Sequence, residues 1–367
     1  MEIRLNREQL LPVVTRVVGV VERRQTLPIL GNLLLQTNNQ GLRMVSTDLE
    51  VEVRGESPAE VTDPGEVTVP ARKFLDIVRN LPEASSLNVK VSGERCVISS
   101  GRGRYVLGTL PASDFPVMQS EVGTDLIEVE EGRFRRLLEK TWFAMAQQDV
   151  RYYLNGLLLE FIPGGIRAVA TDGHRLARYD LSSDLEVEGE GRSIIVPYKT
   201  VMELRRQLLG DETPLRISVG EKSVRFEAGE FVTTTKLIDG RFPDYERVIA
   251  GDHGRTAVIG KERLRGALVR ASVLSNEKYK GVRMEFDGDV LRLQTHNPEQ
   301  EEALEEIDVV CQGDPTSLGF NVSYLLDVLG AVEGDEVEVA FEDGNSSSVW
   351  RGVESMDETF VVMPMRL

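Results

Sequence analysis

The sequence is poor in the residues that build metal sites, disulfide frameworks and membrane spans. Its 367 residues include two cysteines, Cys96 and Cys311, and three histidines, His174, His253 and His296, which show no metal-ligand spacing. No apolar run approaches the roughly 18 residues of a membrane helix, and the start of the chain lacks the pattern of a signal peptide. We therefore expect no secreted scaffold, no membrane protein, no metal site and no cofactor.

Positive charge is also scarce. Lys and Arg number 43 against 60 Asp and Glu, which gives a net charge of −17 in a chain that is 41% hydrophobic and 28% charged. This balance is typical of a soluble, folded, cytoplasmic protein, and its sign argues against a simple nucleic-acid binder. Aromatic residues make up 6%, so base stacking on single strands has little support. The sequence also has no zinc finger, no Walker-type phosphate loop and no RNP-like aromatic pair.

What the sequence does contain is an internal repeat. Residues 41–48 (GLRMVSTD) match residues 165–172 (GIRAVATD) at a shift of 124, and a fainter third copy begins at Val290, 125 residues further on. The apolar segments upstream of the three copies keep the same register. A fixed period of this length predicts consecutive domains of one fold. The predicted domains are residues 1–124, 125–250 and 251–367.

Each copy contains two segments of helical periodicity among short alternating strands. The predicted helices are 7–24, 71–81, 132–148, 198–209, 261–274 and 321–332. Strands with interspersed helices indicate an α+β fold in which two helices per domain cover antiparallel sheets.

The predicted helices reverse the charge of the chain. Five of the six carry a net charge of +2 or +3, so that the residues outside all six hold −28. Within them, Arg72 and Arg79 lie seven apart, as do two further basic pairs, and Arg133, Arg136, Lys140 and Gln147 follow one stripe. A solvated outer face would explain the positive charge of any single helix. Five helices with net positive charge favour instead a surface for sequence-independent phosphate contact.

Two alternatives compete with that interpretation. Asp172 and His174 could form a general-base pair, although no nucleophile is apparent nearby and a capped turn explains them more simply. The acidic run from Glu299 to Glu302 could hold a metal, but it fits a solvated or partner-facing strand better. An acidic scaffold that binds proteins and never meets DNA also stays open.

The chain resembles the β subunit of bacterial DNA polymerase III, the replicative sliding clamp, over essentially its whole length. The matching segments are 26–32 (TLPILGN), 148–156 (QDVRYYLNG), 171–176 (TDGHRL), 239–245 (DGRFPDY), 275–278 (SNEK), 297–302 (NPEQEE) and 361–367 (VVMPMRL). The resemblance implies three clamp-type domains, a head-to-tail homodimeric ring with helices lining its hole, and no enzymatic activity. It implies as partners double-stranded DNA without sequence preference, the replicative polymerase, the clamp loader, and repair or translesion polymerases that bind through short linear motifs.

The DNA-facing set combines two sources. Arg24 and Gln148 match positions that contact DNA in the family, and the remaining members come from the basic helix stripes: Arg72, Arg79, Arg133, Arg136, Lys199, Arg206, Arg263 and Arg270. Tyr198 departs from a basic residue often found beside the matching lysine.

The resemblance also implies a ring-closing interface. On the first domain it comprises Lys73, Ile77, Leu81, Arg102, Arg104, Tyr105 and Leu107, and on the third domain of the partner Val273, Leu274, Glu299, Glu301, Glu302 and Glu305. The opposite charges of the two sets suit a head-to-tail contact.

The apolar end of the chain predicts a partner-peptide pocket. Methionines on both sides of a proline suit an adaptable surface, and Pro364 has no amide to donate to a strand. By resemblance the pocket comprises Leu154, Thr171, Gly173, His174, Arg175, Leu176, Pro243, Arg247, Val248, Asn321, Tyr324, Val361, Val362, Met363, Pro364, Met365, Arg366 and Leu367. The resemblance implies that Asn321 and Tyr324 complete a second subsite of this pocket. Asn345 stands where the family often has an apolar residue, which makes that subsite more polar.

Overall fold

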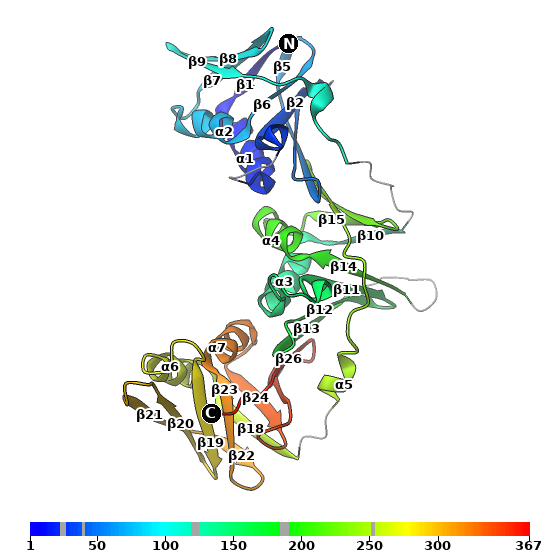
Figure 1. The fold of residues 1–367 in the computed structure, drawn as a ribbon. Coiled ribbons are helices and arrows are strands. Elements are labelled where there is room, and N and C mark those ends of the chain that lie inside the picture. Colours follow the sequence, from blue (N-terminus) through cyan, green and yellow to red (C-terminus); the bar gives the residue numbers. More distant parts are fainter. Residues whose placement is uncertain (23–26, 39–40, 119–124, 184–190, 251–253) are drawn as a thin grey trace. The chain divides into compact units, whose positions relative to one another are not determined.

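The computed structural model describes every residue except 23–26, 39–40, 119–124, 184–190 and 251–253 (Figure 1). The chain divides into two compact units, each built from two segments. Unit 1 comprises Met1–Arg135 and Met202–Leu237, and unit 2 comprises Arg136–Val201 and Ile238–Leu367. The boundaries fall inside helices α3 (Glu131–Thr141) and α4 (Tyr198–Gln207), so the predicted middle domain contributes to both units.

Unit 1 contains two complete helices and two antiparallel sheets. The helices are α1 (Arg7–Val17) and α2 (Ala71–Asn80). The five-stranded sheet has the order β5 (Glu60–Asp63), β1 (Glu2–Asn6), β7 (Ser86–Ser92), β8 (Arg95–Ser100) and β9 (Gly103–Gly108). The eight-stranded sheet has the order β10 (Asp125–Glu130), β15 (Pro214–Val219), β16 (Ser223–Ala228), β17 (Phe231–Lys236), β4 (Val51–Ser57), β3 (Gly41–Thr47), β2 (Asn32–Asn38) and β6 (Glu66–Pro70).

Unit 2 contains α5 (Glu246–Ile249), α6 (Lys261–Ser272) and α7 (Val322–Ala331). Its nine-stranded sheet has the order β14 (Arg192–Pro197), β11 (Gly156–Ile162), β12 (Gly165–Thr171), β13 (Arg175–Ser182), β26 (Glu358–Val362), β25 (Ser348–Gly352), β24 (Glu336–Phe341), β18 (Arg255–Gly260) and β22 (Val310–Gln312). Its four-stranded sheet has the order β21 (Glu302–Asp308), β20 (Val290–His296), β19 (Gly281–Asp287) and β23 (Thr316–Asn321).

The sequence repeat reappears as identical strand registers. Leu35 of β2 pairs with Met44 of β3, and the residues at the corresponding repeat positions, Leu159 with Ala168 and Met284 with Leu293, also pair. A slip of one residue would turn every side chain of a strand to the opposite face of the sheet. Equal registers therefore mean that equivalent side chains face the core in all three copies. The three copies are therefore the same fold at the level of individual residue pairs.

Consecutive repeats are joined by strand pairing. β4 of the first repeat pairs with β17 of the second, and β13 of the second pairs with β26 of the third. By the same correspondence β21 is the third-repeat equivalent of β4 and β13, and β9 is the first-repeat equivalent of β17 and β26. Within the described residues, β21 pairs only with β20, and β9 pairs only with β8.

The predicted helices form, although two of them, α1 and α3, end seven residues earlier than predicted. Asn6 caps α1 by accepting a hydrogen bond from the amide of Glu8, and the α-helical part ends at Val17, where a 3₁₀ turn follows. α3 likewise ends at Thr141, before a 3₁₀ turn. The predicted core positions hold: Leu10, Val14, Phe74 and Val78 lie in the core of unit 1 with 0% exposure. No described helix is long and apolar enough to cross a membrane.

Candidate functional site

The C-terminal tail of the chain is fixed by main-chain hydrogen bonds to two different repeats. After β26 pairs with β13, the amide of Met363 donates to the carbonyl of His174 at 2.8 Å. Two residues later the amide of Met365 donates to the carbonyl of Gly319 in β23, also at 2.8 Å. Pro364 stands between them without a donor. The tail therefore bridges the second and third repeats inside unit 2.

An aromatic and charged cluster lies beside the tail. The rings of His174 and Tyr324 stack with centroids 6.5 Å apart. The guanidinium of Arg175 lies 4.5 Å from the centre of the Tyr324 ring and is held by ion pairs with Asp172 and Asp327. Asp172 also accepts hydrogen bonds from the amides of His174 and Arg175. These bonds make Asp172 the acceptor that orders a turn, which agrees with the capped turn preferred from the sequence over a general-base pair.

The predicted pocket residues divide into a buried set and a more exposed set. Leu154, Thr171, Leu176, Val361 and Val362 are all at most 9% exposed. Val361 and Val362 belong to β26 and are buried as parts of that strand. The exposed or half-buried members are Gly173, His174, Arg175, Pro243, Arg247, Val248, Asn321, Tyr324, Met363, Pro364, Met365, Arg366 and Leu367.

A buried hydroxyl fixes the segment that carries Pro243 and Val248. Tyr245 donates to Glu160 at 2.5 Å and accepts from Arg167 at 3.3 Å. Burial and the neighbouring carboxylate raise the pKa of Tyr245 to about 12. The ring is 7% exposed and packs with Leu176 and Val361 in one apolar cluster. This side chain, which the sequence reasoning did not single out, attaches the segment with Pro243 and Val248 to the sheet.

Two asparagines bear on the polar part of the predicted pocket, Asn321 as a member and Asn345 as a departure from the family. The side chain of Asn321 caps α7 by accepting from the amide of Ser323 at 2.9 Å. Asn345 is exposed in the loop before β25, where its main-chain amide donates to the carboxylate of Asp343. Neither asparagine is buried, so both present polar atoms at the surface.

The predicted DNA-facing residues occupy several environments. Arg24 lies outside the described residues. Arg133, Arg136 and Gln148 are exposed, and Gln148 has a positive φ of 58° in a loop where hydrogen bonds from Arg151 lower the pKa of Asp149 to about 2. Arg72 is exposed and donates to the carbonyl of Val21 at 2.6 Å. The other exposed or half-buried members are Arg79, Lys199, Arg206, Arg263 and Arg270.

Some predicted basic positions serve the fold. Lys140, placed by its spacing on an exposed stripe, is 9% exposed and bonds Glu358, so that part of the interpretation is wrong. Arg206 donates to the carbonyls of Thr15 and Arg16 at the end of α1. Helical spacing gives the direction of a side chain from its own helix, but it carries no information on what a neighbouring repeat places there.

The predicted ring-closing residues gather at the two edge strands. Arg102, Arg104 and Tyr105 are exposed at β9, whereas Leu107 is 8% exposed and belongs to the core of unit 1. Near the other edge strand, β21, Val273 directly follows α6 and is 76% exposed. Among the other predicted members, Leu81 is buried, with 6% exposure. The rest are exposed or half-buried: Lys73, Ile77, Leu274, Glu299, Glu301, Glu302 and Glu305. Sequence reasoning missed Val106 and Leu304, which are 43% and 59% exposed on the same two strands.

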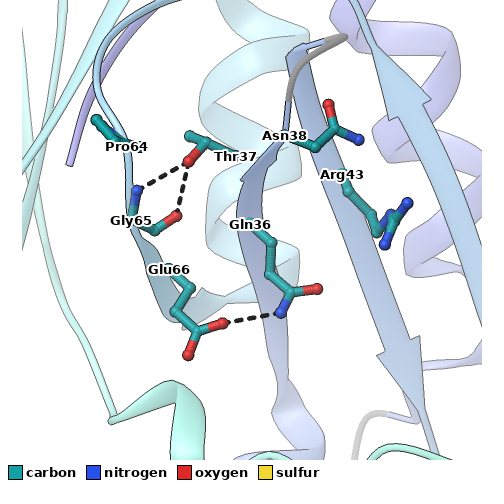
Figure 2. A pocket seen from close by; sticks show the side chains of 7 residues that line it. All are labelled: Gln36, Thr37, Asn38, Arg43, Pro64, Gly65 and Glu66. Carbon is teal, nitrogen blue, oxygen red and sulfur yellow. Dashed lines mark hydrogen bonds between the residues drawn. The ribbon is translucent and has the colours of Figure 1, made fainter.

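Other parts of the described chain offer little chemistry. No group of three or more His, Cys, Asp or Glu among the described residues could hold a metal ion. Figure 2 shows a surface hollow between β2 and β6 in which Gln36 bonds Glu66 and Thr37 bonds Gly65. Arg43, on its rim, donates to Glu56. Since these polar groups satisfy one another, the hollow has little to offer a ligand.

Comparison with known proteins gives this arrangement its family. Models of the N-terminal, central and C-terminal domains of the DNA polymerase III beta subunit match residues 1–119, 128–244 and 246–366. The chain belongs to the DNA polymerase III beta subunit family. It is 47% identical to the beta sliding clamp of Pseudomonas putida and 45% identical to that of Escherichia coli K12, covering 100% of both proteins.

Solved structures agree with the family. The crystal structure of the Pseudomonas aeruginosa DNA polymerase III beta subunit superposes with a TM-score of 0.97 at 45% identity, and that of Caulobacter crescentus pol III beta with 0.94 at 37%. Both comparisons cover 100% of this chain and of the other. The α+β fold of three clamp domains and the function of a DNA sliding clamp, both predicted from the sequence, are confirmed.

Proposed function

We propose that two copies of this chain close head to tail into a ring around duplex DNA and tether the replicative polymerase to it. The strand pairing of the repeats carries the proposal. Two junctions form within the chain, β4 with β17 and β13 with β26, and their next equivalent is β21 with β9. Since one chain leaves both strands at sheet edges, two chains supply both missing junctions and close the ring.

The register of the missing junction follows from the existing ones. Thr234 lies opposite Glu52, and Val361 lies opposite Leu176. Following the pairings strand by strand makes Glu302 equivalent to Glu52 and Leu176, and Val106 equivalent to Thr234 and Val361. Glu302 then faces Val106 of the partner subunit. This register sets Leu304 opposite Arg104 of the partner subunit, whose side chain is within diagonal reach of Glu302.

Basic helix faces supply the attraction for DNA. Weak contacts from exposed residues such as Arg133, Arg136 and Gln148 hold phosphates without selecting one register, which suits a ring that slides. The acidic remainder of the chain disfavours DNA elsewhere. Removing two exposed members of the DNA-facing set, Arg133 and Gln148, lowers the affinity for DNA and flattens its salt dependence. An unchanged slope after removal of four would refute the set.

The groove along the C-terminal tail receives short peptides from polymerases, repair proteins and the clamp loader. Exposed Met363 beside the stacked His174 and Tyr324 provides an apolar surface with a few polar groups, which is the usual composition of a binding site. Tethering raises the concentration of the polymerase near the primer end without any catalytic step. We therefore assign the chain no enzymatic activity and a place in the cytoplasm, with loading carried out by another protein.

Retention on DNA tests the ring. The protein, assembled on nicked circular DNA with its loader, stays bound through gel filtration and is lost after the circle is linearised. An acidic scaffold would not be retained on either form, and a simple DNA binder would be retained equally on both.

Deletion of Met363 to Leu367 tests the groove separately. The truncated protein still dimerises and stays on circular DNA, but fluorescently labelled peptides from the polymerase no longer bind it. Native affinity for those peptides in the truncated protein would contradict the assignment of the groove.

A further inference from the structure

The ends of the helices at the two internal junctions share a feature that the sequence alone does not reveal. The first helix of each repeat, α1, α3 or α6, has a cation as its tenth residue: Arg16, Lys140 and Arg270. All three lie in the last turn, where main-chain carbonyls without helical partners attract positive charge. We call these residues the helix-end cations.

At both internal junctions the helix-end cation contacts residues of the neighbouring repeat. Lys140 donates to the carbonyl of Ala331, the last residue of α7, and to Glu358 of β26 at 2.8 Å. Arg16 lies 4.4 Å from the centre of the Phe231 ring on β17 and lines a small internal space with Gln207, the last residue of α4. In each case a cation faces the end of the next repeat's second helix, whose terminal carbonyls are also negative.

The strand registers place the partners of these cations at equivalent points. Phe231 lies opposite Gly55, and Glu358 lies opposite Tyr179. The same registers make Gly103 of β9 the equivalent of Phe231 and Glu358, and Glu305 of β21 the equivalent of Gly55 and Tyr179. Gly103 has no side chain to meet a cation. The carboxylate comes instead from the other strand, because Glu305 bonds Arg270 at 2.6 and 2.9 Å.

We infer that Arg270 is a ring-closing residue rather than a DNA-facing one. This inference rests on the proposed dimeric ring and assigns a residue that the basic stripe had placed on the DNA side. In the closed ring, Arg270 stays paired with Glu305 above Gly103 of the partner subunit and donates to the last carbonyls of the partner's second helix, which ends at Asn80. In the separate chain the pair is exposed, with 60% of the Arg270 side chain accessible.

Three substitutions test the inference by sedimentation at decreasing protein concentration. Arg270→Ala weakens dimerisation at least about tenfold, because one member of an interfacial charge pair is lost. Arg270→Lys retains most of the affinity, since lysine serves at the equivalent position 140. Arg265→Ala is the control: this residue lies on the same helix, is exposed, and has a weak pair with Glu262 at 3.9 Å. It leaves the dimer unchanged.

A second measurement separates ring closure from DNA contact. At protein concentrations that keep the Arg270→Ala variant dimeric, the salt dependence of its DNA binding equals that of the wild-type protein. A flatter slope, or a dimer as stable as that of Arg265→Ala, would overturn the inference. A wild-type protein that is monomeric throughout would instead contradict the proposed ring itself.

Discussion

The two junctions inside the chain and the two strand edges left over are built from equivalent residues in different surroundings. At the β13–β26 junction the Lys140 side chain is 11% exposed and its partner Glu358 is 0% exposed. At the edge, Arg270 occupies the same helix position but is 60% exposed, with Glu305 at 24%. One sequence position is therefore part of a core in one repeat and part of a surface in another. The difference comes from the neighbouring strand, because the local fold is the same.

This comparison has an energetic meaning. A buried ion pair contributes through the cost of breaking it, whereas an exposed pair contributes little because water screens both charges. The pKa of Glu305 lies below its ordinary value because Arg270 donates to it, but both groups remain in solvent. At this edge the pair therefore contributes little to the stability of the single chain.

The largest expected effect comes from the buried cation. Lys140→Ala leaves Glu358 buried without its main partner and lowers the free energy of unfolding by about 3–5 kcal/mol. Arg270→Ala, measured in a monomeric background, lowers it far less, because water screens the exposed pair with Glu305. Urea unfolding followed by circular dichroism measures both. Equal losses would mean that burial does not distinguish the two positions.

Loss of apolar contact at the edge has the second largest expected effect. Replacing Val273 and Leu274 together with alanine removes about 2–4 kcal/mol from dimerisation, since central apolar groups dominate such interfaces. Sedimentation of the double variant gives monomers at concentrations where the wild-type protein is dimeric. The free energy of unfolding changes little, because Val273 is 76% exposed in the single chain. A persistent dimer at low concentration would argue against this edge.

The β4–β17 junction can be disturbed with a single methyl group. A Cβ at Gly55 would lie 2.8 and 2.9 Å from methyl groups of Val13 and Val17 on α1, and 3.1 Å from the ring of Phe231 on β17. Gly55→Ala therefore overpacks the junction and costs about 1–3 kcal/mol of unfolding free energy. Gly31→Ala, where nothing lies within 4 Å, is the matched control. Equal free energies of unfolding for the two variants would show that the junction accommodates a methyl group at position 55 without strain.

The smallest effect concerns the groove wall at high pH. The folded-state pKa of Tyr245, about 12, exceeds its ordinary value of 10.0. The raised pKa gives a stabilisation that is complete below pH 10 and is lost as the pH rises toward 12. Tyr245→Phe removes this part of the pH dependence, by about 1 kcal/mol or more between the two values. Urea unfolding curves at pH 9 and pH 11 give the free energy of unfolding of the wild-type protein and of Tyr245→Phe. An equal loss of this free energy between the two pH values in both proteins would contradict the raised pKa of the buried hydroxyl.

Much of the fold follows from local pattern. Apolar spacing identifies the helices because a helix buries one face, as Leu10, Val14 and Phe74 show. The predicted ends of α1 and α3 lie too far along the chain, because periodicity continues into 3₁₀ turns that also bury their apolar residues. The groove residues follow from resemblance, and spacing could not have assembled them, since His174, Gly319 and Met363 lie in three segments that are far apart in the sequence.

The sequence by itself determined the three repeats, their α+β composition, the basic helices in an acidic chain and the apolar tail, since each depends on which residues follow one another. Only the tertiary structure decided which equivalent positions are core and which are surface. Lys140 and Arg270 have the same place in their helices, but a neighbouring strand covers the first and none in the described chain covers the second. Burial depends on pairing between distant segments, and local sequence does not encode it.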